Sequence, residues 1–373
     1  MTERRVPFLS LAHGVDAADA AAIRAAIDRV IARGWFILGP EVEAFEAEFA
    51  AASGAAHAIG VGTGTDAIAL ALRAVGVGSG DEVITSPLSA AYSALAVLMT
   101  GARPVFTDID PERLTIDPRA IEAAITPRTR AIVPVHLYGQ PAAMREIADI
   151  ATRHQLAIVE DCCQAHLATE SGRPVGTIGI AGAFSFYPTK NLGALGDGGA
   201  IVTNDASLAD RLKRLRNGGQ RDRYHHLEPG INSRLDEIQA AILRARLPRL
   251  TEWTARRRAV AARYRAALAA HPIAGVTVAD EIDAGHVYHL FVVRSTSRDE
   301  LQAGLAARGV ETLIHYPVPI PEQPALAGAH PAHCPIASRI CGEILSLPLH
   351  AALRDDDVDA VASALKGHDA CVH

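Results

Sequence analysis

Short apolar runs alternate with longer amphipathic stretches through much of the chain, and this alternation restricts the fold more than any other feature. Strands that alternate with helices are typical of a parallel sheet whose faces are covered by helices. The sequence therefore predicts an α/β protein with a large, mainly parallel sheet flanked by helices. The predicted strands are residues 82–85, 104–107, 131–135, 157–160, 183–186 and 200–203, and helices are predicted at 66–75, 142–154 and 207–216.

A second, smaller α/β domain is predicted toward the carboxyl end. Residues 233–270 have a helical pattern that is interrupted near Pro248, and an apolar run at 287–293 precedes a helical stretch at 298–308. A chain of 373 residues is long enough to bury two cores. We therefore expect a large domain over residues 1–250 and a small domain over residues 251–373.

Charge and composition argue against several classes of function. The 36 basic and 42 acidic residues give a net charge of −6, which argues against nucleic acid as the main partner. The amino-terminal residues have no apolar signal segment, no apolar run is long enough to span a bilayer, and the five cysteines have no CxxC spacing. We expect a cytoplasmic protein with reduced thiols and no membrane partner. No metal site is predicted, because His136, His166, His289 and His315 lack ligand spacing on one element.

Polar side chains follow two of the predicted strands at their carboxyl ends, where open α/β sheets bind ligands. Asp161 follows one strand, with Gln164 three residues later, and Ser185 ends another strand, with Lys190 five residues later beside several glycines. A buried aspartate can pair with a protonated pyridine nitrogen, and a desolvated lysine can attack an aldehyde. Taken singly, a helix-capping aspartate and a solvated loop lysine remain alternatives.

The segment Gly60-Val-Gly-Thr-Gly-Thr-Asp66 precedes a helical pattern. Its backbone N–H groups around Gly64, with the hydroxyls of Thr63 and Thr65, would form a phosphate cup at a helix N-terminus. The segment is neither a Walker A loop nor a GxGxxG signature, and a capped glycine-rich turn remains an alternative. A phosphate cup, carboxylate, amide, hydroxyl and lysine in this order on one sheet edge are together the groups that hold pyridoxal phosphate.

With these residues placed, the sequence resembles the DegT/StrS family of pyridoxal-phosphate-dependent sugar aminotransferases over nearly its whole length. The resemblance implies the aspartate-aminotransferase fold, fold type I, and a homodimer with two shared active sites. The motifs that carry it are Trp35-Phe-Ile-Leu-Gly-Pro-Glu-Val42, the segment 60–66, Pro134-Val-His-Leu-Tyr-Gly139, Glu160-Asp161 with Gln164-Ala-His166, the segment 184–199, Asn232-Ser-Arg-Leu-Asp-Glu-Ile-Gln-Ala240, His315-Tyr-Pro-Val-Pro319 and Leu345-Ser-Leu-Pro-Leu349.

The resemblance also implies roles for individual residues. Lys190 would form the Schiff base, Asp161 would pair with the pyridinium nitrogen, and Gln164 would hydrogen-bond the ring hydroxyl. Ser185 would bind the phosphate together with the loop Thr63-Gly64-Thr65. Asn232 occupies the family position that reaches across the dimer interface to the phosphate bound by the partner subunit.

Three departures from the family pattern concern the surroundings of the cofactor. The family commonly has an aromatic residue against the cofactor ring, where this chain has Ala90 or Ala91, so the neighbouring Tyr92 is a predicted ring contact. The usual Gln-Ala-His-Gly ends here in Leu167, which predicts a different local loop. Arg216-Asn-Gly-Gly219 has glycine where a bulkier residue is frequent, which predicts a wider substrate entrance.

The predicted reaction is a ping-pong transfer of an amino group from a donor, expected to be glutamate, to a keto sugar linked to a nucleotide. Arg234, His315, Tyr316 and Tyr187 are the predicted substrate contacts, although a surface salt bridge is an equal alternative for Arg234. Three other functions stay open: amination of a keto-cyclitol, dehydration of a sugar on the same cofactor, and non-catalytic sensing of a phosphorylated ligand. Family dehydratases have histidine in place of the lysine, so Lys190 favours transamination.

Overall fold

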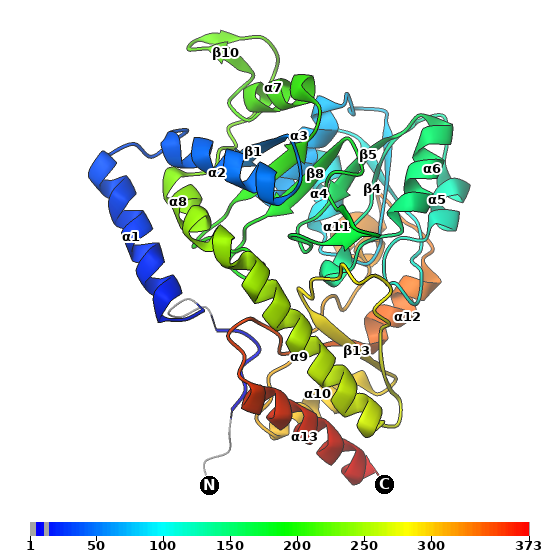
Figure 1. Cartoon of the computed structure of the whole chain (residues 1–373). Coiled ribbons are helices and arrows are strands. Elements are labelled where there is room, and N and C mark those ends of the chain that lie inside the picture. The colour runs from blue at the N-terminus through cyan, green and yellow to red at the C-terminus, as the bar shows by residue number, and fades with distance from the viewer. Residues whose placement is uncertain (1–4, 11–14, 373) are drawn as a thin grey trace.

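A seven-stranded sheet organises the larger part of the molecule (Figure 1). The structure is a computed structural model, and it describes residues 5–10 and 15–372. Neighbouring strands are parallel except at β9, which is antiparallel to both of its neighbours, so the predicted mainly parallel sheet is confirmed. All six predicted strands are present, each within two residues of its predicted bounds. In spatial order the strands are β1 (His57–Val61), β9 (Gly199–Thr203), β8 (Ala181–Ser185), β5 (Ala157–Asp161), β4 (Thr129–Val133), β2 (Glu82–Thr85) and β3 (Arg103–Phe106).

Helices cover both faces of this sheet because successive residues of a strand point to opposite sides. Val83 of β2 packs into the core that contains Ile68 of α3, whereas the adjacent Ile84 packs into the core that contains Ile147 of α6. The strands therefore have continuous apolar runs instead of an alternating pattern. The helices of this part are α1 (Ala17–Arg33), α2 (Pro40–Ala52), α3 (Gly64–Ala74), α4 (Tyr92–Met99), α5 (Pro118–Ala124), α6 (Met144–His154), α7 (Ala206–Leu215) and α8 (Glu237–Arg246).

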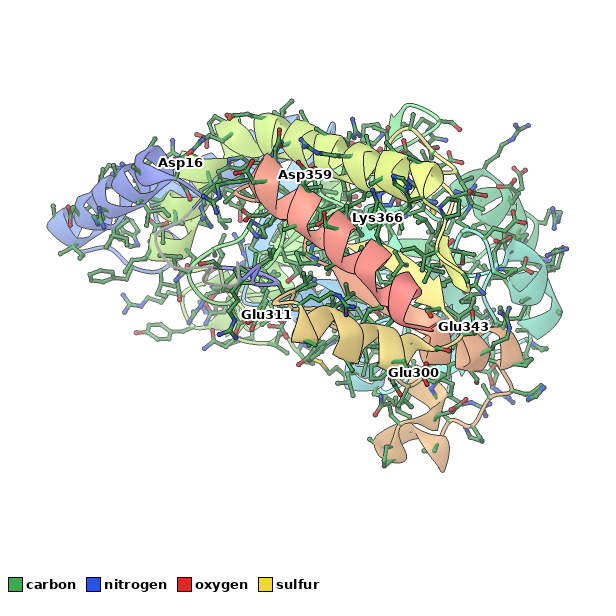
Figure 2. All side chains as sticks on the ribbon, turned by 90° about the horizontal axis from the view of Figure 1, so that it is seen from below. Asp16, Glu300, Glu311, Glu343, Asp359 and Lys366 are labelled. Carbon is green, nitrogen blue, oxygen red and sulfur yellow. The ribbon has the colours of Figure 1, made fainter. Side chains whose placement is uncertain are left out.

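A second, antiparallel sheet of three strands forms toward the carboxyl end, with α13 lying beside α9 and α10 (Figure 2). The predicted helix break at Pro248 is present as a short 3-10 turn between α8 and α9. Val6 pairs with Val310 and belongs to the core of this second sheet, so the amino-terminal segment packs here. A domain division at residue 250 stays a prediction. The elements are η2 (Leu247–Arg249), α9 (Leu250–Ala270), β12 (Val276–Val278), β13 (Phe291–Ser295), α10 (Arg298–Ala307), η3 (Ile320–Glu322), α11 (Pro324–Ala327), α12 (Pro335–Glu343), β14 (Ile344–Leu347) and α13 (Asp355–Val372).

Two short hairpins and one 3-10 turn complete the described elements. One hairpin projects beyond α7 (Figure 1). Within the described ranges, we find no helix that has both the length and the apolar character needed to cross a membrane. The remaining elements are η1 (Leu137–Gly139), β6 (Thr169–Glu170) paired with β7 (Arg173–Pro174), and β10 (Gln220–Asp222) paired with β11 (His225–His226).

The buried carboxylate of Glu237 joins two segments that are nearly 200 residues apart in sequence. It accepts the backbone N–H groups of Gly39 at 2.9 Å, Glu41 at 3.0 Å and Val42 at 2.8 Å, which are otherwise free at the start of α2. A Cβ atom at Gly39 would lie 2.8 Å from the Glu237 carboxylate, so a larger residue here would displace that carboxylate. A negative charge is also favourable at a helix N-terminus.

Glu237→Ala is therefore expected to lower the free energy of unfolding by about 2–4 kcal/mol, because three buried N–H groups lose their acceptor. Urea denaturation followed by circular dichroism measures the change. Glu43→Ala is the matched control, since Glu43 is exposed on the same first turn of α2. Equal unfolding midpoints for the two variants would show that the carboxylate does not stabilise the fold.

Candidate active site

Asp161 is the last residue of β5 and is only 4% exposed. Its Oδ1 accepts the N–H of Cys163 at 3.1 Å, and its Oδ2 accepts the hydroxyl of Ser93 at 2.7 Å. No helix follows it directly, so the alternative of a helix cap is wrong. No basic side chain of the described residues forms an ion pair with this carboxylate. A buried carboxylate without a counter-ion is suited to a cationic ligand group such as a pyridinium.

Lys190 lies on the loop after β8, where its backbone N–H donates to the carbonyl of Tyr187 at 2.8 Å. Burial lowers the pKa of Lys190 below 10.5, although the nearby Cys163 and Asp161 oppose this shift. Within the described part of the chain, the ammonium has no hydrogen-bond or ion-pair partner. Lys190 is partly buried, and the lowered pKa favours the uncharged amine that a nucleophile needs.

The loop before α3 presents unpaired donors toward Ser185. Thr63 caps the helix, because its hydroxyl accepts the N–H of Asp66 at 3.0 Å. The N–H groups of Gly64 and Thr65 have no acceptor among the described residues. A Cβ atom at Gly64 would lie 2.7 Å from Cβ of Ser185, so glycine is what allows the loop to approach β8 this closely. Two free N–H groups at a helix N-terminus beside a hydroxyl fit a phosphate.

Gln164 connects the large sheet to the segment that carries Tyr316. Its Oε1 accepts the N–H of Tyr138 at 2.7 Å, and its Nε2 donates to the hydroxyl of Tyr316 at 3.1 Å. Burial raises the pKa of Tyr316 to about 12, so its hydroxyl keeps its proton at neutral pH. The amide has a second N–H that can donate to a ring hydroxyl. Tyr92 opens α4 and is 63% exposed, and its contact with the ring stays a prediction.

The segment around Asn232 meets the phosphate loop through a different residue. Ser233 accepts the N–H of Gly62 at 2.9 Å and donates to Asp66 at 2.7 Å. The side chain of Asn232 is exposed, and the position pairs through its backbone with Asn217. Its predicted reach into a partner subunit therefore stays a prediction.

Three of the four predicted substrate contacts lie at the edges of the site. Arg234 donates to the amide oxygen of Asn217 at 3.0 Å and forms no ion pair with any described carboxylate. Tyr187 is half exposed beside Ser185. His315 bonds Ser346 at 2.9 Å, and burial, together with the charge of Lys190, lowers the pKa of His315 to about 4. Their contacts with substrate stay predictions.

His136, Glu160 and Cys162 are close enough together to be considered as metal ligands, with donor atoms within 4.8 Å of one another. The Glu160 carboxylate, however, accepts three backbone N–H groups of the loop 176–179 at 2.7–2.8 Å, and it lies 3.0 Å from Nε2 of His136. Nδ1 of His136 accepts the N–H of Ala142 at 3.0 Å, so Nε2 carries the proton and donates. These bonds already engage the carboxylate of Glu160 and both ring nitrogens of His136. The expectation of no metal stays a prediction.

Two of the sequence departures are explained by backbone conformation. Gly219 has φ of +76°, and a Cβ atom there would lie 1.7 Å from the carbonyl of Glu228, so the turn itself requires glycine and a wider entrance is not needed to explain it. Leu167 has φ of 62°, in the left-handed region that favours glycine. The loop therefore has the conformation of a glycine despite the leucine, and the expected different loop has no support.

Sequence reasoning missed Ser93, whose hydroxyl holds Asp161. In the sequence, Ser93 was marked only by its position at the end of the segment 85–93. No sequence pattern pairs a serine with a carboxylate 68 residues later. Ser93→Ala is expected to lower kcat about tenfold, since hydrogen bonds to charged groups contribute about 1.5–3 kcal/mol. Ser93→Thr keeps a hydroxyl at this position and should restore the rate. An alanine variant with an unchanged rate would remove this positioning role.

These features define a class of protein. A buried carboxylate without a counter-ion, a desolvated lysine and free helix N–H groups meet at the carboxyl edge of a mainly parallel sheet. They fit the ring nitrogen, aldehyde and phosphate of pyridoxal phosphate in an enzyme of fold type I.

Comparison with known proteins identifies the family. Residues 17–366 match the DegT/DnrJ/EryC1/StrS aminotransferase family. The dTDP-3-amino-3,4,6-trideoxy-alpha-D-glucose transaminase of Streptomyces venezuelae is 50% identical over 347 residues, which cover 92% of this chain and 91% of the relative. The chain belongs to the DegT/DnrJ/EryC1/StrS aminotransferase family.

Solved structures agree with this assignment. DesV of S. venezuelae in complex with a ketimine intermediate has a TM-score of 0.94 and 48% identity, covering 97% of this chain and 98% of that chain. NtdA of Bacillus subtilis with bound cofactor PMP has a TM-score of 0.92 and 30% identity, covering 98% of this chain and 85% of that chain. The predicted family, fold type, cofactor and aminotransferase class are confirmed.

Proposed function

We propose that this protein transfers an amino group from an amino acid to the 3-keto group of a dTDP-linked deoxysugar. The observation that carries the transamination is Lys190, a desolvated amine without a hydrogen-bond partner among the described residues, close enough to Asp161 for its pKa to respond to that charge. The choice of acceptor is supported by the relative that is 50% identical, whose name specifies a dTDP-linked 3-amino sugar.

The residues of the site have separate tasks in this reaction. Pyridoxal phosphate, when bound, supplies an aldehyde and an electron-withdrawing ring. The N–H groups of Gly64 and Thr65, with the Ser185 hydroxyl, would hold the phosphate, and the Asp161 carboxylate would keep the ring nitrogen protonated. Nζ of Lys190 would take the proton from the α-carbon of the amino donor and, in the second half-reaction, deliver a proton to the sugar carbon that receives the amine.

We also propose that the protein is a homodimer. Trp35, Phe36 and Ile37 lie together before α2 and are 56%, 48% and 40% exposed, which supports burial against a second copy. The exposed Asn232 is available to a partner in the same way. Light scattering at micromolar concentration should give twice the mass of the 39.3 kDa chain.

A cytoplasmic location is supported by the cysteines, since Cys162, Cys163, Cys334 and Cys341 are free thiols.

The acceptor is tested with the enzyme loaded with pyridoxamine phosphate. In single-turnover measurements, a dTDP-3-keto-6-deoxysugar should react at least about 100-fold more efficiently than its 4-keto isomer, because a misplaced carbonyl cannot reach the reacting atoms. A keto-cyclitol is the third acceptor in the series. Faster conversion of the 4-keto sugar or of the cyclitol would overturn the proposed acceptor.

A further inference from the structure

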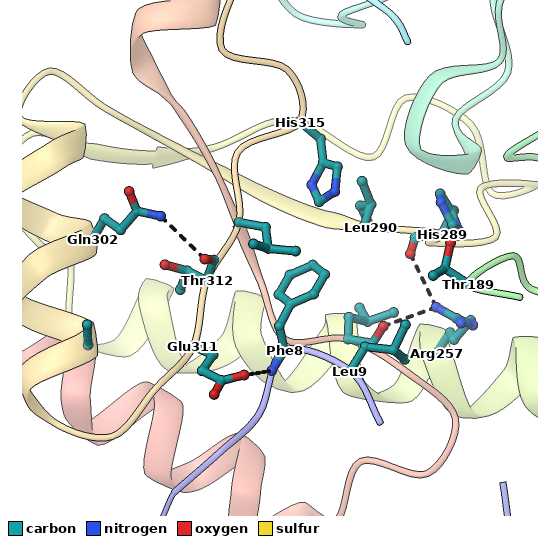
Figure 3. A pocket seen from close by; sticks show the side chains of 13 residues that line it. Phe8, Leu9, Thr189, Arg257, His289, Leu290, Gln302, Glu311, Thr312 and His315 are labelled. Carbon is teal, nitrogen blue, oxygen red and sulfur yellow. Dashed lines mark hydrogen bonds between the residues drawn. The ribbon is translucent and has the colours of Figure 1, made fainter. Parts of the chain in front are cut away.

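A buried arginine stands at a cavity beside the proposed active site (Figure 3). The cavity has a volume of about 630 Å³ and lies between the amino-terminal segment and the second sheet. Phe8, Thr189, His289 and His315 are among its lining residues, together with Arg257 of α9. Arg257 also lines a smaller adjoining cavity that includes Lys190. Arg257 and the lysine that would carry out the chemistry thus line one cavity.

No carboxylate of the part of the chain that the structure describes pairs with the guanidinium of Arg257. The residue is 6% exposed, and only its Nη1 is engaged, donating to the carbonyls of Tyr288 at 3.2 Å, His289 at 3.2 Å and Leu349 at 3.1 Å. Burial lowers the pKa of Arg257 to about 10, so the group remains charged at neutral pH. Nε has no acceptor, and no carboxylate of the described residues forms an ion pair with it. A buried cation in this state is costly until an anion joins it.

A second arginine, Arg246, has the anionic partner that a buried arginine usually has. Arg246 lines the smaller cavity as well, but its guanidinium is paired with Asp19 at 2.8 Å and 3.1 Å. Arg257 is thus distinguished from Arg246 by the missing carboxylate and not by burial alone. Nε is enclosed, so Nη2, which makes no hydrogen bond within the described residues, is the donor left for an anion in the cavity.

The surroundings favour a carboxylate over the other anions of the reaction. The phosphate of the cofactor has its own donors at the start of α3. His289 and His315 are neutral at neutral pH, because burial lowers the pKa of both rings. The one carboxylate of the lining, Glu311, is paired with Arg5 at 2.7 Å, and the other lining residues around Arg257 are neutral or apolar. This suits a single negative charge better than a diphosphate.

We propose that Arg257 binds a carboxylate of the amino donor and so orients its amino group toward Lys190. This inference rests on the proposed function, since it assigns a donor contact within the same reaction. It gives the donor an anchor on α9.

Ping-pong kinetics allow the two substrates to be tested separately. Arg257→Lys and Arg257→Met are compared with Arg256→Lys, a neighbouring position whose guanidinium pairs with Asp355 near the surface. The donor half-reaction is followed by the spectral change when the loaded enzyme meets glutamate without acceptor. We expect kcat/KM of this half-reaction to fall about 100-fold in the Arg257 variants, as for loss of a buried charge partner, with less than about threefold change in the acceptor half-reaction. Equal losses in both halves would mean that Arg257 only supports the structure, and the proposal would be wrong.

Rates with donor analogues give a measurement that would not change if Arg257 only supported the fold. The wild-type enzyme should discriminate glutamate from glutamine or from isoglutamine, depending on which carboxylate meets Arg257, and the Arg257 variants should lose this discrimination. If no variant folds, a crystal structure of the wild-type holoenzyme with 2-methylglutamate, which has no α-proton to lose, decides the matter. A carboxylate oxygen within hydrogen-bond distance of Arg257 supports the proposal, and a carboxylate bound elsewhere overturns it. A wild-type enzyme that reacts with glutamate but not with the dTDP-sugar would instead refute only the proposed acceptor.

Discussion

Lys190→Ala is expected to lower the transamination rate by at least about 10⁴-fold, because the substitution removes both the nucleophile and the group that moves the proton. The variant should also lose the visible absorbance of the lysine-bound cofactor. Purified wild-type protein treated with borohydride should carry the reduced cofactor on Lys190, and peptide mapping is unambiguous because the chain has only three lysines, at 190, 213 and 366.

The other two lysines provide matched controls for this experiment. Lys213 on α7 and Lys366 on α13 are both exposed. Figure 2 shows Lys366. Replacement of either lysine by alanine should leave the rate and the spectrum unchanged. Full turnover by Lys190→Ala, or labelling at either of the other positions, would contradict the proposed mechanism.

Asp161→Asn is expected to reduce kcat about 10²–10³-fold, the usual consequence of removing one preorganised electrostatic contact. Asparagine keeps the shape and can still accept the Ser93 hydroxyl, so the fold and cofactor binding should persist. Its neutral amide cannot hold a positive charge on the ring nitrogen, and the loss should therefore appear in kcat. Absorbance of the bound cofactor and steady-state rates, measured on the same sample, separate the two effects.

Two further variants make the Asp161 result interpretable. Asp205→Asn changes an exposed cap of α7 and should leave the rate unchanged. Asp161→Glu retains the charge but shifts it, and it should recover part of the rate. An Asp161→Asn enzyme with bound cofactor and normal turnover would show that the carboxylate is not paired with the ring nitrogen.

The sheet, and the polar residues that follow its strands, could be predicted from the sequence because both depend on local patterns. A strand buried on both faces has a continuous apolar run, as in Glu82–Thr85, whose predicted bounds match β2. β1 was missed since His57-Ala-Ile-Gly-Val61 contains small residues that are poor strand formers. Asp161 and Lys190 could be singled out because each follows such a run at the edge of the sheet where ligands bind.

Contacts between distant segments were decided by the tertiary structure alone. Asp161 and Ser93, or Glu237 and the start of α2, are paired only because the folded backbone brings them within hydrogen-bond distance. That no carboxylate of the described residues pairs with Arg257 is likewise a property of its three-dimensional surroundings, since its sequence neighbours Arg256 and Arg258 are arginines too. The sequence by itself determined which chemical groups stand at the sheet edge, because strand patterns and loop spacing are local. Which of those groups are satisfied and which are free for a ligand depends on partners far away in the chain, and only the packed structure supplies them.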